Sequence, residues 1–246
     1  MDQSVTLLQL KARKLEKRGN VFVLTLTGNG KHQFNPSSIE DITKALDFVH
    51  MAPGPKALTT TNEGKYFSTG LDLKWIEQNL PSCLKIIQLK FEGLMCKMMK
   101  LGLPTCAAIN GHGSAGGFIF ALVHDYRHLK NDKVAFYMGE IDHEMLMHRS
   151  WMSVITEKVP PFCLKSVVLK AHKFAASDAL WRGLVDGFMG CSKTNLEQAM
   201  REGNALVMRK CDMEVYASLR CRLYSSMIEE LEAHTDPYSL PKCSWL

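Results

Sequence analysis

The sequence feature that most constrains the fold is a glycine-rich segment, residues 109–122, with the sequence INGHGSAGGFIFAL. Residues 104–109 before the glycines favour a strand, and residues 117–124 after them favour a helix. The glycines therefore lie at a strand-to-helix turn, and residues 111–116 have the G-x-G-x-x-G spacing of a dinucleotide-binding turn. Three roles fit such a turn: a nucleotide site, close helix packing without a ligand, or backbone N–H groups that stabilise an oxyanion.

The surrounding sequence disfavours the dinucleotide role. That motif usually opens its domain, whereas residues 1–110 precede it here. Asp132 lies at the distance expected of a ribose-binding acid, but the segment before it, YRHLKND, is a poor buried parallel strand. We therefore expect no NAD or FAD.

Composition and charge disfavour several further classes of protein. A length of 246 residues, 46% of them hydrophobic, supports one domain with a full core. The net charge of +5 comes from lysines and arginines spread along the chain, which disfavours nucleic-acid binding. The eight cysteines show no C-x-x-C pair and no metal-ligand spacing, so we expect a reducing compartment and no metal site. No apolar run approaches the ~18 residues of a membrane span, so no membrane partner is expected.

Strand and helix signals alternate over the first two thirds of the chain. The sequence predicts a hairpin over residues 15–26, then a helix at whose start Ser37 and Glu40 have the spacing of a capping box. A strand follows over residues 57–62, and a long helix is predicted over residues 80–100. This order is typical of an α/β protein.

The composition changes after the Pro-Pro pair at residues 160–161. Two long amphipathic segments, residues 196–209 and 213–234, favour helices. We therefore predict an α/β core over residues 1–190 and a helical C-terminal region over residues 191–246.

A second turn of the same kind lies earlier, in the segment YFSTGLDL, where Gly70 frees the backbone just before Leu71. An oxyanion such as a thioester enolate is best held by two N–H donors, and helix N-termini add partial positive charge. The two turns together favour the oxyanion role over the others.

Three motifs in order give the chain a resemblance to the crotonase (enoyl-CoA hydratase/isomerase) superfamily. FSTGLDLKW is similar to its F-x-x-G-x-D-[LI] segment, and LPTCAAINGHGSAGGFIFALVHDYRHL resembles its N-G-x-x-x-G-G segment. AASDALWRGLVDGF resembles its A-x-x-A-x-x-x-G-L-V-D signature. Within the superfamily, the tripeptides N-G-H and H-D-Y resemble most those of the plant-type peroxisomal Δ3,Δ2-enoyl-CoA isomerases.

This resemblance implies a fold and an assembly. The expected fold is an α/β, crotonase-like spiral of repeated ββα units with a C-terminal helical trimerisation region. The chain is expected to form a homo-oligomer, either a trimer or a hexamer. Its substrate would be an acyl-CoA thioester, so coenzyme A is part of the substrate and not a separate cofactor.

The resemblance also implies the residues of the site. The N–H groups of Leu71 and Gly116 would form the oxyanion hole, and Lys74 would meet the coenzyme phosphates or remain a solvated helix lysine. The loop expected to line the pantetheine end consists of Ser68, Thr69, Gly70, Leu71, Asp72 and Leu73.

Hydratases of this superfamily use two glutamates, and only one is matched here. The first position holds Ile119, which cannot transfer a proton, and the second holds Glu140. One acid in an apolar pocket suits an isomerase that moves the double bond of a 3-enoyl-CoA to trans-2-enoyl-CoA in fatty-acid β-oxidation. The open alternative for Glu140 is a surface or salt-bridged residue without a catalytic role.

Two departures from the family pattern follow Glu140. Glu144 and His148 stand where family members usually have glycine and proline. Glu144 would reshape the acyl pocket or place a second carboxylate near the first. The alternative function is therefore a divergent or inactive crotonase-fold protein that only binds acyl-CoA.

The resemblance implies a peroxisomal location. The chain ends in Ser244-Trp245-Leu246, which lacks the basic middle residue of the S-K-L address. A cytosolic location is the alternative.

Overall fold

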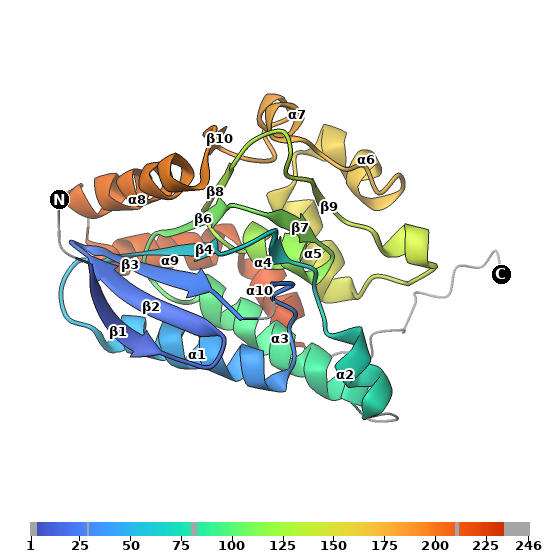
Figure 1. Ribbon diagram of the computed structural model, residues 1–246, viewed down its shortest axis with the longest axis horizontal. Helices are drawn as coiled ribbons and strands as arrows, with labels where there is room; N and C mark the ends of the chain where they lie inside the picture. Colours follow the sequence, from blue (N-terminus) through green and yellow to red (C-terminus); the bar gives the residue numbers. More distant parts are fainter. Residues whose placement is uncertain (1–3, 29, 80–82, 210–211, 234–246) are drawn as a thin grey trace.

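The computed structural model describes residues 4–28, 30–79, 83–209 and 212–233, whose strands form two sheets (Figure 1). The seven-stranded sheet has the order β1-β2-β3-β4-β6-β8-β10, and the three-stranded sheet has the order β5-β7-β9. The pairs β1–β2 and β2–β3 are antiparallel, and all other neighbouring strands are parallel. The strands are β1 Val5–Gln9, β2 Arg13–Arg18, β3 Val21–Leu26, β4 Ala57–Asn62, β5 Tyr66–Ser68, β6 Thr105–Ile109, β7 His112–Ser114, β8 Tyr126–Leu129, β9 Phe136–Tyr137 and β10 Gly187–Phe188.

Helices connect and cover these strands. They are α1 Pro36–Met51, α2 Leu73–Gln78, α3 Cys83–Met99, α4 Gly116–Leu122, α5 Arg149–Lys158, α6 Leu164–Val168, α7 Ala176–Trp181, α8 Ser192–Met208, α9 Met213–Leu223 and α10 Ser225–Glu232. Two short 3-10 helices, η1 Glu140–His143 and η2 Pro161–Cys163, precede α5 and α6. In the part of the chain that the structure describes, no helix is both long and apolar enough to cross a membrane.

The chain repeats a unit of two strands and a helical segment. In each unit the first strand joins the large sheet and the second joins the small one: β4 and β5, then β6 and β7, then β8 and β9. Equivalent strands of successive units pair in parallel, so the chain advances by one strand position in both sheets with each turn. The predicted spiral of ββα units is confirmed.

The large sheet lies between two layers of helices (Figure 1). Strand β3 alternates between them, as the period of a strand requires. Phe22, Leu24 and Leu26 are buried in the main core with residues of α1 and α3. Val21 and Val23 face the other way and pack with residues of α8, which lies on the opposite side of the sheet from α1 and α3.

The start of α1 differs from the predicted capping box. The N-cap is Asn35, whose side chain accepts a hydrogen bond from the backbone N–H of Ser38, while the Ser38 hydroxyl accepts one from the Asn35 N–H. The pairing of Ser37 with Glu40 was wrong because Pro36 takes the first helical position, which fixes Asn35 as the cap.

The predicted helix over residues 213–234 is broken at Tyr224 into α9 and α10. Helix α10 turns to pack against α3 and α5, and it buries Met227, Ile228 and Leu231. A straight continuation of α9 would not follow that surface, so the break lets both helices contact the core. His234 lies outside the described residues, and the boundary between residues 190 and 191 stays a prediction.

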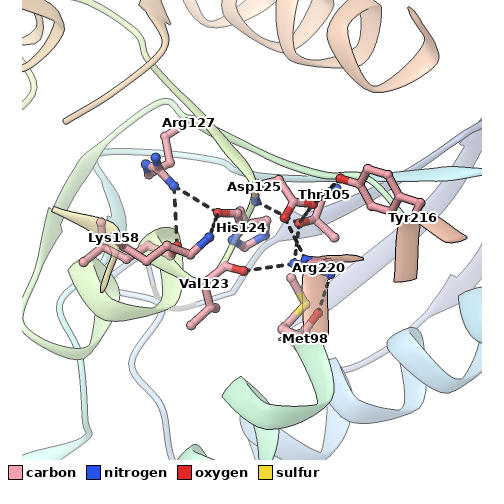
Figure 2. Close-up of polar contacts among 10 residues, drawn as sticks. Met98, Thr105, Val123, His124, Asp125, Arg127, Lys158, Tyr216 and Arg220 are labelled. Atoms are coloured by element: carbon pink, nitrogen blue, oxygen red, sulfur yellow. Dashed lines mark hydrogen bonds and ion pairs between the residues drawn. The ribbon is translucent and has the colours of Figure 1, made fainter. Parts of the chain in front are cut away.

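One arginine holds α9 to the core. Arg220 is buried, forms an ion pair with Asp125 at 2.7 Å, and donates to the carbonyl oxygens of Met98 and Val123 and to the Thr105 hydroxyl (Figure 2). These partners come from α3, the start of β6 and the end of α4, so α9 is fixed to three segments at once.

Candidate active site

The two glycine turns predicted to act together lie against each other. Gly70 has φ +89°, and a Cβ at this position would lie only 2.8 Å from the Gly116 nitrogen. A Cβ at Gly116 would lie 3.2 Å from Gly70 Cα and 3.5 Å from the Leu71 nitrogen. The turns therefore approach this closely because neither glycine carries a side chain.

The N–H groups of Leu71 and Gly116 are available at this contact. Phe34 donates to Gly70 O at 2.8 Å and accepts from Asp72 N–H at 2.9 Å, which leaves the Leu71 N–H directed away from Phe34. Gly116 begins α4, where the first N–H groups have no acceptor within the helix. Among the described residues neither N–H has an acceptor, so both can donate to one ligand oxygen.

The first two glycines of the G-x-G-x-x-G motif have a different role. A Cβ at Gly111 would lie 2.5 Å from Lys65 O, and one at Gly113 would lie 3.0 Å from the Phe136 ring. Asp132 is exposed in a loop, where it accepts from the Ser177 N–H. The motif therefore allows close packing of β7 and does not form a turn that leads directly from β6 into a helix.

A cavity of about 600 Å³ opens beside the two turns. This volume is within the range of small-molecule sites. Thr69, Leu71 and Ala115 line it at the turns, and Glu140 lines it from η1. Its further apolar wall consists of Leu73, Leu84, Met145, Leu146 and Trp151.

Glu140 is a buried carboxylic acid in this wall. It is 8% exposed, and its Oε2 has no hydrogen-bond partner among the described residues. Burial raises the pKa of Glu140, and hydrogen bonds from the backbone of Glu140 and Gly139 and the charge of His143 oppose this only in part. A carboxyl in such surroundings is suited to exchange a proton with a ligand.

The structure also shows where Ile119 and Glu144 lie, the two other positions that bear on the predicted chemistry. Ile119 is fully buried in α4, where its side chain joins the main core. Glu144 is exposed, does not line the cavity, and caps η1 with φ +54°. This left-handed backbone explains why family members usually have glycine at the position. Glu144 does not place a second carboxylate in the cavity.

The predicted loop of residues 68–74 divides into two groups. Thr69, Leu71 and Leu73 line the cavity. Ser68 is buried behind it, donates to His32 O and accepts from Gly70 N–H, so it fixes the turn. Asp72 caps α2 through Trp75 N–H.

Lys74 is exposed on the same helix, α2. Whether it meets coenzyme phosphates stays a prediction.

Sequence reasoning missed one wall of the cavity. Gln88 from α3 and His148 at the start of α5 both line it. In the sequence, His148 stands out as a departure from the usual proline, and no pattern around it indicates that it lines a cavity. A signal was available in the buried polar residues Gln88 and Glu92, which interrupt the apolar face of α3.

No group of three His, Cys, Asp or Glu residues suited to a metal ion occurs in the described ranges. His124 is buried and bonded to Phe120 O and the Thr60 hydroxyl, and burial lowers its pKa to about 3. His112 accepts from the Ala135 N–H. Both histidines therefore support the backbone.

The two-sheet spiral and the paired turns define the crotonase fold. Solved structures of an enoyl-CoA isomerase from Mycobacterium tuberculosis and an enoyl-CoA hydratase/isomerase family protein from Pseudomonas syringae share it. Their TM-scores are 0.80 and 0.82, at 16% and 20% identity, over 91% of this chain and 96% and 94% of theirs. At this identity they show the fold alone.

The sequence itself places the chain in a family. The enoyl-CoA hydratase/isomerase family model matches residues 16–232, and the chain belongs to that family. It is 35% identical to "Enoyl-CoA delta isomerase 1, peroxisomal" of Arabidopsis thaliana, over 90% of this chain and 91% of that protein. It is 33% identical to "Enoyl-CoA delta isomerase 2, peroxisomal" of the same plant, over 93% and 98%.

Proposed function

We propose that this protein is an enoyl-CoA isomerase that moves the double bond of a 3-enoyl-CoA to the 2-position. The relatives named as enoyl-CoA delta isomerases support this proposal, because they match the chain over nearly all of its length. The paired turns and the buried acid support it independently, since an isomerase of this kind needs one base and one oxyanion site.

The reaction follows from the groups at the cavity. The N–H groups of Leu71 and Gly116 hold the thioester oxygen, and the Glu140 carboxylate takes a proton from C2. The electrons of that C–H bond form the dienolate, whose negative charge on the oxygen is stabilised by the two donors. The acid then returns the proton at C4, so the double bond moves and Glu140 is a carboxylate again.

One observation carries the proposal. Among the described residues that line the cavity, Glu140 is the only carboxylic acid. Hydration needs a base that activates water for attack on one carbon and an acid that protonates the neighbouring carbon. Isomerisation needs one group that moves a single proton. Because burial raises the pKa of Glu140, the rate should fall with decreasing pH as its carboxylate becomes protonated.

The relatives also suggest a setting. Two of them are named as peroxisomal, and a "Fatty acid oxidation complex subunit alpha" of Acinetobacter baylyi is 34% identical over 49% of this chain and 17% of its own length. We therefore propose that the reaction belongs to peroxisomal fatty-acid β-oxidation, with an acyl-CoA thioester as substrate and no separate cofactor. The C-terminal Ser-Trp-Leu lies outside the described residues.

The test compares two reactions of the same protein. With protein far below substrate concentration, 3-hexenoyl-CoA should be converted over many turnovers, while hydration of crotonyl-CoA should be negligible because Ile119 replaces the other glutamate that hydratases use. Hydration as fast as isomerisation would show that another residue moves the second proton. Binding of acyl-CoA without turnover of either substrate would favour the non-catalytic alternative.

A further inference from the structure

A buried polar cluster of Glu92, His148 and Ser150 lies behind one wall of the cavity. The His148 Nδ1 is 2.7 Å from Glu92 Oε1 and 2.7 Å from the Ser150 hydroxyl, which itself donates to Glu92 Oε1 at 2.8 Å. The Glu92 and His148 side chains are 1% and 6% exposed. The proposed isomerisation uses none of these three residues.

The distances fix one proton of the cluster. A carboxylate oxygen and an unprotonated ring nitrogen would repel each other at 2.7 Å, so Nδ1 carries the proton and donates it toward Glu92. The Ser150 backbone N–H also points at Nδ1, at 3.3 Å, as the N-cap contact of α5. This contact conflicts with a proton on Nδ1, and the shorter contact with Glu92 takes priority. Glu92 and Ser150 therefore fix the ring of His148.

The other ring nitrogen is left for a ligand. His148 is the member of the cluster that lines the cavity, and within the described residues its Nε2 has no hydrogen-bond partner. Gln88 lines the same wall and is 8% exposed. The buried indole N–H of Trp151, which also lines the cavity, has no acceptor among the described residues. This wall thus adds polar groups to a cavity whose lining already includes Glu140, His143 and Tyr137.

The polar wall and the oxyanion turns belong to one site. Phe91 connects them: its Cζ would lie 3.5 Å from a Cβ at Gly116, and its ring packs edge-on against Trp151 with a centroid distance of 5.6 Å. The turns would hold the thioester oxygen, and Glu140 would reach C2 and C4 of the acyl chain. His148 lines the same cavity a few residues after Glu140, so we assign the acyl chain to it.

We propose that His148, held by Glu92 and Ser150, is a specificity residue that binds a hydroxyl group on the acyl chain of the substrate. This inference rests on the proposed function, because it assumes that the cavity holds an acyl-CoA. A plain alkyl chain would displace water from Nε2 and from the Gln88 amide. It would not replace the hydrogen bonds that the water makes to these groups, which is unfavourable.

A hydroxyl fits this wall better than a keto or carboxylate group. When Nδ1 carries the ring proton toward Glu92, Nε2 is an acceptor, and a hydroxyl can donate to it. A keto oxygen can only accept, and a carboxylate would bring a second negative charge near Glu92. Of these three groups, only the hydroxyl can donate to Nε2 and also accept from the Gln88 amide.

The test measures binding of unreactive ligands by calorimetry. The ligands are octanoyl-CoA and a series of monohydroxy-octanoyl-CoAs in which the hydroxyl is moved along the chain. At least one hydroxylated ligand should bind wild-type protein about ten-fold or more tightly than octanoyl-CoA. This preference should be lost in His148→Phe. A Leu84→Ala variant, which changes the apolar wall, should weaken both kinds of ligand alike and keep the preference.

A second variant guards against misfolding. His148→Phe alone leaves Glu92 buried without the histidine that pairs with it, whereas Glu92→Leu combined with His148→Phe removes the whole pair and should also lose the preference. Equal affinity for octanoyl-CoA and every hydroxylated ligand, or a preference that persists in both variants, would overturn this inference alone. Failure of all acyl-CoAs to bind would overturn the proposed function as well.

Discussion

At the scale of single residues, the contact between Gly70 and Gly116 determines whether the oxyanion site is open. Gly70→Ala adds a methyl group 2.8 Å from the Gly116 nitrogen at φ +89°. It should reduce kcat by about 10²–10³-fold, as loss of one oxyanion donor does. Gly64→Ala is the matched control, because Gly64 has φ +74° with open space around it. Steady-state kinetics of both variants check this, and an equal loss in both would contradict the account.

Much of the site could be predicted at this scale. The two glycine turns could be read from local sequence, and the family resemblance pointed to Leu71, Gly116 and Glu140; the structure places Leu71 and Glu140 in the cavity lining. Asn35 was missed as a cap because Ser37 and Glu40 also have capping spacing, and only the position of Pro36 in the folded helix decides between them.

At the scale of elements, Lys158 lies at the packing of α5 against the C-terminal helices. It is buried, its ammonium lies 3.8 Å from the Tyr224 ring, and it donates to His124 O at 3.3 Å. Burial, and to a smaller extent the charge of Arg127, lowers its pKa from 10.5 to about 7. His124 O also accepts from Arg127 at 2.9 Å, so removal of Lys158 leaves no unpaired acceptor (Figure 2).

A pH-dependent stability follows. Between pH 7 and 10.5 the unfolded chain binds more protons at Lys158 than the folded chain, so the stability rises with pH. The free-energy cost of burying Lys158 is therefore largest below pH 7 and disappears as the pH rises to 10.5. Lys158→Met should therefore be more stable than wild type by up to about 5 kcal/mol below pH 7, with the difference shrinking above it. Urea unfolding across this range measures it. A difference that does not change with pH would contradict the account, and the exposed Lys165→Met should show no such trend.

Element prediction succeeded where the pattern is long and failed where packing decides. The hairpin, α1 and α3 carry clear periodicity. The strands of the small sheet are short, and β9 spans only Phe136–Tyr137. Its pairing with β7 and Phe174 stabilises it, and a segment this short has no sequence periodicity of its own. The break at Tyr224 depends on the surface that α10 meets, which no local pattern contains.

At the scale of the whole molecule, α9 exposes an apolar stripe. Val215, Leu219 and Leu223 recur every four residues and are 50%, 61% and 67% exposed, while Arg220 beside them is buried. We expect this stripe to contact a second copy in a homo-oligomer, a trimer or a dimer of trimers.

Light scattering tests this assembly. Wild-type protein should have the mass of a trimer or hexamer, and Leu219→Glu should lower it because a charge in the contact must be desolvated. Met51→Glu changes a single exposed apolar residue elsewhere and should keep the wild-type mass. A monomeric wild type at working concentration would refute the expectation.

The cavity shows what the sequence could not predict at this scale. Its walls come from α3, η1 and α5 as well as from the two turns, and the contact of His148 with Glu92 joins residues of different elements. Motifs identified the turns and the acid, but the position of α3 against α5 arises from packing of the whole core.

The central claim is that Glu140 moves the proton, and its replacement tests this most directly. Glu140→Gln keeps the size and polarity of the side chain but removes the base. Isomerisation of 3-hexenoyl-CoA should therefore fall by about 10²–10⁴-fold. Calorimetric affinity for octanoyl-CoA should stay close to that of wild type, because the oxyanion donors are backbone groups. Wild-type turnover in Glu140→Gln, with activity lost instead in Glu144→Gly, would contradict the account.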